Sequence, residues 1–248
     1  MVFWTCYVFK VNPKIDNFVK DIIASKGEYA YDKIDEKTLY FYIDNIQTMQ
    51  HGKIIKVGVD KPFQVSNREE GKVLVKETVS LTVCFYDEIN GISNILAVFG
   101  SGENVSSFKY AMRMIVSERV KESKQFPNLV VVPPILPIGF RLKGKEKELS
   151  KYFSNIRELS AKNIKDLYVH RASIGGSFLE QSSEYQKYVR ASDVSGDISY
   201  LGVTFKDRVI MLSSEGKIWT RQGKEEVEFS TVEEILKILQ TCGATFTS

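Results

Sequence analysis

The chain has 248 residues, of which 43% are hydrophobic, so it is long enough to bury a substantial core and to form two domains. It carries 34 basic and 31 acidic residues, a formal net charge of +3, and this balance argues against a dedicated, strongly basic nucleic-acid binder. Cys6, Cys84 and Cys242 are far apart and form no Cys-x-x-Cys pair. This pattern argues against a zinc or disulfide framework and favours a reducing compartment, the cytoplasm. The apolar opening, residues 1–9, is too short to span a bilayer, so no membrane association is predicted.

The first half of the chain reads as a strand, a helix, four strands and a helix. Residues 2–11 predict a strand, and apolar residues at helical spacing after Asn12-Pro13 predict a helix. Alternating apolar residues then predict strands over residues 37–46, 53–59, 72–86 and 92–99. Asn90-Gly91 predicts a tight hairpin turn, because both central residues of a type I′ turn need positive φ. A second helix is predicted over residues 105–121.

A proline-rich connector separates the two halves. Pro133, Pro134 and Pro137 remove backbone donors and forbid a helix, so we place a first domain at residues 1–137 and a second at 138–248. The second domain is predicted to begin with an extra helix. Its first elements are predicted as a helix at 145–157, a strand at 163–172 and a helix at 182–191.

Four short strands followed by one amphipathic helix organise the second half. The strands are expected at residues 198–205, 208–212, 217–220 and 225–229, with turn residues between them. The helix is expected to begin at the N-cap Thr231, to bury Ile235, Leu236, Ile238 and Leu239, and to end at Gly243. It covers one face of the sheet and leaves the other face open.

Alternation along the strand at 198–205 predicts which side chains lie on the open face. Ser199, Leu201, Val203 and Phe205 are the more apolar set and are expected to face the helices. The other set, Ile198, Tyr200, Gly202 and Thr204, is then open, and Gly202 leaves room for a partner to approach.

The order β-α-β4-α, read twice, predicts an α+β fold of two tandem halves with antiparallel sheets and helices on one face. This doubled order resembles the TATA-box-binding protein family, whose continuous sheet lies on the minor groove of DNA. Residues 199–206, SYLGVTFK, and 209–218, VIMLSSEGKI, are similar to the second repeat of that family, including its Ser-Gly-Lys hairpin, here interrupted by Glu215. The resemblance implies that bulky side chains wedge between base steps, at positions that align with Tyr200 and Leu212. No residue of the first half can be aligned with these wedge positions.

A catalytic site is not indicated by the sequence. His51 and His170 are isolated, and no nucleophile motif, metal motif or dinucleotide fingerprint is present. The loop Gly100-Ser-Gly-Glu-Asn precedes a helix, where a phosphate could bind, but Glu103 would repel an anion and a simple turn is the alternative. We therefore predict no cofactor and no metal.

The sequence thus predicts a non-enzymatic binding protein whose open sheet face contacts nucleic acid, with duplex DNA as the ligand that the resemblance implies. A protein-interaction or scaffold module that uses the same face is the alternative, and an enzyme without a recognisable motif is the third. The oligomeric state stays open. The predicted nucleic-acid contacts are Tyr200, Thr204, Lys206, Arg208, Leu212, Lys217 and Arg221.

Overall fold

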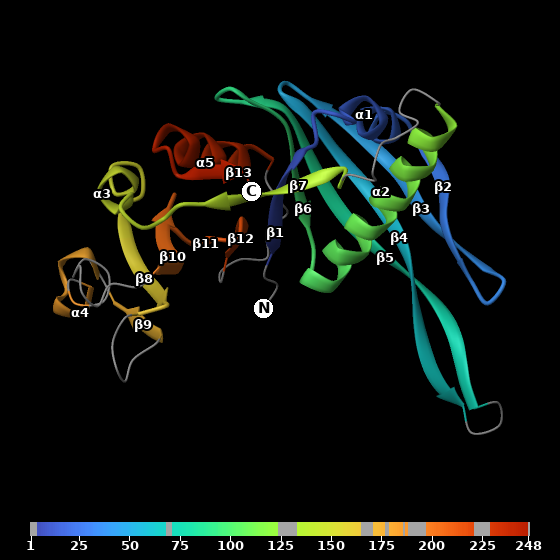
Figure 1. The fold of residues 1–248 in the computed structure, drawn as a ribbon. Helices are drawn as coiled ribbons and strands as arrows, with labels where there is room; N and C mark the ends of the chain where they lie inside the picture. Colours follow the sequence, from blue (N-terminus) through green and yellow to red (C-terminus); the bar gives the residue numbers. More distant parts are fainter. Residues whose placement is uncertain are drawn as a thin grey trace. The chain divides into compact units, whose positions relative to one another are not determined.

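The structure is a computed structural model that describes residues 4–67, 71–123, 133–164, 171–176, 179–185, 187, 197–220 and 229–247 (Figure 1). It confirms an α+β protein built on antiparallel strands with few helices. The chain falls into two compact units. The N-terminal unit comprises Phe9–Glu88 and Ile92–Leu136, and the C-terminal unit comprises Met1–Val8, Ile89–Gly91 and Pro137–Ser248.

The N-terminal unit is a sheet in the order β2-β3-β4-β5-β6 with two helices. Strand β1, Thr5–Val11, begins in the other unit and ends in this one. The remaining elements are α1 (Asp16–Ala24), β2 (Gly27–Ile34), β3 (Lys37–Met49), β4 (Gly52–Asn67), β5 (Gly71–Ile89), β6 (Ile92–Phe99) and α2 (Gly102–Glu122). Helix α2 packs on β2, β4 and α1. The rings of Phe41 and Phe108, 5.8 Å apart between centroids, join sheet and helix in the core.

Strand β2 is absent from the sequence-based prediction, so five strands rather than four follow α1. Its connection to β3 is a two-residue turn at Asp35 and Glu36, whose φ angles are 47° and 63°. Neither residue is a glycine, so the usual sequence signal of such a turn is missing. The Asn90-Gly91 turn is confirmed, with φ angles of 46° and 84°.

Strands β4 and β5 continue as a two-stranded arm beyond the last residues that β3 pairs, and Figure 1 shows this arm projecting from the sheet. Asp60 lies where the arm leaves. Its carboxylate is fully buried and accepts hydrogen bonds from the Tyr40 N–H at 3.0 Å and the Thr78 hydroxyl at 2.6 Å. Lys76 Nζ lies 3.0 Å from the same carboxylate, and the Tyr31 hydroxyl donates to the Asp60 carbonyl. The Asp60 carboxylate therefore accepts the hydrogen bond of a β3 N–H group that lies just beyond the last β3–β4 pair.

The C-terminal unit is a sheet in the order β12-β11-β10-β8-β9, and β1 pairs with β12 through Thr5, Cys6 and Tyr7. A short second ladder joins β13 to β7. The elements are β7 (Ile135–Phe140), α3 (Glu146–Leu149), β8 (Asn155–Lys162), β9 (Arg171–Gly175), η1 (Leu179–Gln181), α4 (Ser183–Tyr185), β10 (Asp197–Phe205), β11 (Arg208–Ser213), β12 (Lys217–Thr220), α5 (Phe229–Thr241) and β13 (Thr245–Thr247).

The early elements of this unit differ from the prediction. The helix expected at 145–157 is only the one-turn α3, because residues from Asn155 onward join the sheet as β8. Phe153, within the range of the expected helix, is buried, whereas Tyr152 is 49% exposed. Of the strand expected at 163–172, Asn163 has a φ of 57° and lies beyond the end of β8, while Arg171 and Ala172 belong to β9. Residues 165–170 lie outside the described residues.

The later elements follow the prediction closely up to residue 220. Strands β10, β11 and β12 have almost the predicted bounds. Of the strand expected at 225–229, only Phe229 is described, and it starts α5, so Thr231 is a buried helical residue and not the N-cap. Gly243, with a φ of 59°, ends the helix as predicted. Of the helix expected at 182–191, Ser183–Tyr185 form α4, and most of the rest lies outside the described residues.

The three cysteines are buried and form no disulfide with one another, and burial raises the pKa of the Cys84 thiol to about 12. Within the described ranges, no helix has both the length and the apolar character needed to cross a membrane.

Candidate sheet-face binding site

One face of the C-terminal sheet is closed. Residues that stand opposite one another across the strands share this face and are buried: Cys6, Ile218, Leu212, Leu201 and Leu159. Helix α5 contributes buried Val232, Ile235, Leu236 and Leu239. An ion pair of 2.6 Å between Lys206 and Glu234 ties the β10–β11 turn to α5, and Figure 1 shows the helix beside these strands. We call this side the helix-facing side.

The opposite side, which we call the open face, carries half-buried aromatic side chains. Tyr200 and Trp219 pack edge to face, with ring centroids 5.9 Å apart and an interplanar angle of 68°. Lys217 Nζ lies 4.9 Å from the Trp219 ring centroid and 5.7 Å from that of Tyr7. Tyr7, Tyr200, Lys217 and Trp219 form what we call the ring cluster. These residues come from three strands of one sheet, β1, β10 and β12, so the cluster is held in place before any ligand binds.

Met211 lies on the open face beside the ring cluster, between Trp219 and Gly202. It stands opposite both Trp219 and Gly202 in the strand pairing and is fully buried. A Cβ atom added to Gly202 would lie 2.9 Å from Met211 Sδ and 2.9 Å from Glu158 Cβ. The space above Gly202 is therefore filled by this chain's own side chains. The expectation that Gly202 admits a partner is wrong.

The Gly202→Ala variant is expected to lower the free energy of unfolding by about 1 to 3 kcal/mol, because the added methyl group overpacks this site. Gly175→Ala is the matched control, since a Cβ there meets no atom within 4 Å. Urea unfolding of both variants checks the prediction. Equal midpoints for the two variants would show that Met211 and Glu158 move aside without cost.

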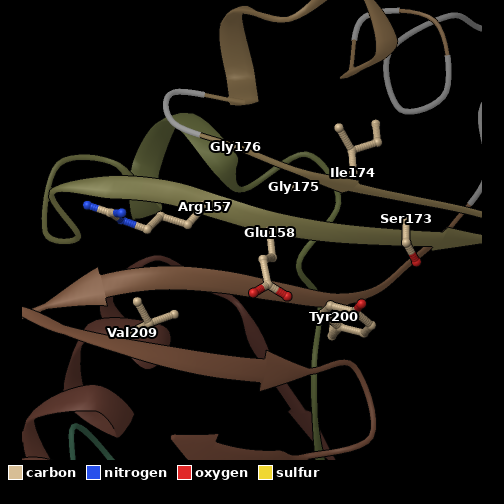
Figure 2. A pocket seen from close by; sticks show the side chains of 8 residues that line it. All are labelled: Arg157, Glu158, Ser173, Ile174, Gly175, Gly176, Tyr200 and Val209. Carbon is tan, nitrogen blue, oxygen red and sulfur yellow. The ribbon is translucent and has the colours of Figure 1, made fainter. Parts of the chain in front are cut away.

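A hollow of about 510 Å³ adjoins the ring cluster at Tyr200 (Figure 2). Glu158 and Tyr200 project into it from adjacent strands, and Ser173, Gly175 and Val209 complete much of its lining. Gly175 stands opposite Glu158 in the pairing, and its missing side chain keeps the hollow open on the β9 side. The hollow thus joins a carboxylate, a serine hydroxyl and an aromatic ring.

Arg157 lies at the rim of this hollow on a β-bulge. The register shifts between Gly202–Glu158 and Val203–Ile156, so Arg157 is the extra residue of β8. Its side chain is exposed, and its Nε donates a hydrogen bond of 3.1 Å to the Thr204 hydroxyl. A guanidinium has five donors in a planar fork, which suits a phosphate. Arg157 and Lys217 therefore both bring positive charge to the open face.

The structure places the predicted contact residues on both sides of the sheet. Tyr200, Thr204 and Lys217 lie on the open face. Leu212 is fully buried on the helix-facing side, so its assignment as a wedge is wrong. Arg208 stands opposite Phe205, which also places it on the helix-facing side.

Two further predicted contacts are not available on the open face. Lys206 Nζ is paired with Glu234 of α5. Arg221 lies outside the described residues. Ile198, expected on the open face, is 3% exposed, because a register shift between Ile198 and Tyr200 reverses the alternation there.

The sequence-based prediction missed Tyr7, Arg157 and Trp219. The Trp219 position could have been found, since buried Ile218 and outward Lys217 imply an outward residue 219. No comparable signal exists for Tyr7, which reaches the open face only because β1 pairs with β12. The bulge that presents Arg157 also leaves no mark in the sequence.

Comparisons of the chain with protein families, with curated proteins and with solved structures found no match. In the described part of the chain, no group of three or more His, Cys, Asp or Glu residues could hold a metal ion.

Proposed function

We propose that the open face of the C-terminal unit binds nucleic acid through the ring cluster. The observation that carries this proposal is the position of the Lys217 ammonium between two half-exposed aromatic rings, with a third ring packed against Trp219. Aromatic side chains stack on bases, and a lysine beside them contacts the backbone phosphates. Both kinds of contact are offered by one face.

The resemblance to the TATA-box-binding protein family belongs to the same proposal. Each unit combines an antiparallel sheet with helices, and we propose that the two are duplicated halves of β-α-strands-α type. In this proposal the open sheet face of the C-terminal unit is the ligand-binding side, as in that family. The known family contact by a wedge at the Leu212 position is not part of the proposal, because Leu212 is buried.

A protein partner is the competing occupant of this face. Tyrosine and tryptophan are enriched at protein interfaces as well as on nucleic-acid-binding sheets. The salt dependence of the affinity distinguishes a nucleic acid from a protein partner. Phosphate contacts release counterions, so added salt weakens them steeply, whereas an apolar protein interface releases none.

Fluorescence anisotropy with labelled oligonucleotides, single-stranded and duplex, at low and physiological salt tests the proposal. We expect binding at low salt, and we expect Lys217→Ala to reduce the slope of log K against log salt by about 0.7 to 0.9, one phosphate contact. Lys109→Ala is the matched control, because the Lys109 ammonium also lies over an aromatic ring, that of Phe9 at 5.7 Å, but on α2. If neither oligonucleotide form binds at low salt, the nucleic-acid proposal is wrong and a protein partner takes its place.

A further inference from the structure

We infer that the open face takes single-stranded rather than duplex nucleic acid, with unpaired bases stacked on the ring cluster. This inference rests on the proposed function and specifies its ligand. It follows from the position of the wedge residue, the charges of the face, the spacing of the rings and the chemistry of the hollow.

The two positions that the resemblance aligns with wedges, Tyr200 and Leu212, do not present a free wedge on the open face. Sheets that bind the minor groove insert apolar wedges between base steps. Leu212 is on the helix-facing side, and Met211, the apolar residue of β11 on the open face next to Trp219, is fully buried above Gly202. Tyr200 is packed edge to face with Trp219 instead of standing alone as a wedge.

The charges of the face also disfavour a duplex. A duplex presents one phosphate charge per about 1.7 Å of its axis and needs many cations. Lys206 and Lys162 are each within ion-pair distance of a glutamate, Glu234 at 2.6 Å and Glu215 at 3.7 Å. Glu158 adds a negative charge in the middle of the face.

The ring cluster suits unpaired bases. Tyr7, Trp219 and Tyr200 come from β1, β12 and β10 of one sheet, in which neighbouring strands lie about 4.8 Å apart and β11 separates β12 from β10. Sheets of this kind stack two or three bases on their exposed aromatic rings. A base can reach such a ring with its π-face only when it has left the helical stack.

The hollow beside Tyr200 offers hydrogen-bonding groups to the edge of a base. Its volume, about 510 Å³, falls in the range of small-ligand pockets. The Glu158 carboxylate can accept from a base amino group, and the Ser173 hydroxyl can donate or accept. Figure 2 shows that both line the hollow with Tyr200. In a duplex, the Watson–Crick edge that these groups would meet is already paired.

Tryptophan fluorescence tests this inference at the ring itself. The chain has two tryptophans, so Trp4→Phe leaves Trp219 as the sole reporter. A short mixed-sequence oligodeoxynucleotide is titrated into this variant as a single strand and then as the duplex with its complement. We expect the single strand to quench Trp219 and to bind more tightly than the duplex.

Two substitutions and one control complete the test. Tyr200→Leu and Trp219→Leu, which keep apolar bulk but remove the ring, are expected to weaken single-strand binding roughly 5- to 150-fold each. Tyr152→Leu is the control, because Tyr152 is an exposed ring in the turn after α3 and its loss should leave affinity unchanged. Urea unfolding verifies that the variants fold. If Trp219→Leu does not fold, Tyr200→Leu and the quenching titration carry the test.

The outcomes separate the inference from the proposed function. If the duplex binds as tightly as the single strand, the inference is wrong while the nucleic-acid proposal stands. If the single strand binds without quenching Trp219, or binds both leucine variants as tightly as the native chain, the bases do not stack on the ring cluster and the inference is again overturned. If neither form binds, both proposals fall.

Discussion

Asp60→Ala is expected to lower the free energy of unfolding by about 3 kcal/mol, because it removes one buried carboxylate that several donors share. The Tyr40 N–H, the Thr78 hydroxyl and the Tyr42 hydroxyl all donate to it, and Lys76 completes the set at 3.0 Å. Thr78 and Lys76 can turn to water, since their side chains are near the surface. The backbone N–H of Tyr40 cannot, so it is left without an acceptor at the point where β4 departs from β3.

The same carboxylate makes stability depend on pH. Burial alone would raise the pKa of Asp60, but hydrogen bonds from Thr78 and Lys76 outweigh burial and hold this pKa below its ordinary value. A lowered pKa in the folded chain means that the stabilisation is complete above the unfolded value, about 3.9, and is lost as pH falls through the folded value. We therefore expect the stability difference between the native chain and Asp60→Asn to be constant near neutral pH and to shrink in acid.

Urea unfolding at neutral and acid pH measures both effects. Lys76→Met is the matched control, because it removes the charge partner but leaves the carboxylate and its three donors in place, and its loss of stability should be the smaller. A denaturation midpoint for Asp60→Ala equal to that of the native chain would contradict the role given to this residue. So would a stability difference for Asp60→Asn that grows as pH falls.

Asp60 also illustrates what the sequence does not reveal. Period-two alternation correctly predicted a strand over residues 37–46, because Leu39, Phe41 and Ile43 on one face of β3 are apolar and buried. The same rule cannot show that an aspartate in β4 is buried, since its partners come from β2, β3 and β5. Long-range pairing decides its environment.

In the described part of the chain, three two-residue turns connect neighbouring strands with positive φ at both positions, and the sequence predicted two of them. Asn90-Gly91 and Lys206-Asp207 were both expected as turns, and both have positive φ at each position. Asp35-Glu36 adopts the same geometry and, like Lys206-Asp207, contains neither asparagine nor glycine. Strand β2 before it is exposed or half-buried at most positions and lacks the apolar alternation that marked the strands around Lys206-Asp207, so β2 was missed. Local sequence preference is only one contribution to a turn, and strand pairing on either side can override it.

For the open face, the alternation of side chains within each strand could be predicted from the sequence, but the pairing of the strands with one another could not. The side of Tyr200, Thr204 and Lys217 follows from period two within each strand. Leu212 and Arg208 were assigned from a resemblance and from their place near strand ends, and the strand pairing puts both on the other side. The ring cluster depends on β1 lying beside β12, a pairing between residues more than 200 positions apart in the chain.

Leu239→Ala is expected to lower the free energy of unfolding by about 2 to 5 kcal/mol, because Leu239 is fully buried in the core between α5 and the sheet. The cost includes the lost transfer of the side chain and the cavity that remains. That cavity cannot close by moving the helix end, which is held from two directions. The Ala244 N–H donates to the Leu239 carbonyl at 2.8 Å, and the Asn90 side-chain amide donates to the Lys237 carbonyl at 3.2 Å.

Ile238→Ala is the matched control on the same helix. Ile238 is only half-buried, so shortening it by the same number of carbons should cost clearly less than the Leu239 change. The two variants are compared by their urea midpoints at neutral pH. If they lose stability equally, the stripe of Ile235, Leu236 and Leu239 does not form the closed core on which the helix-facing side depends. Helix α5 would then not cover the helix-facing side, and that side could not be distinguished from the open face by burial.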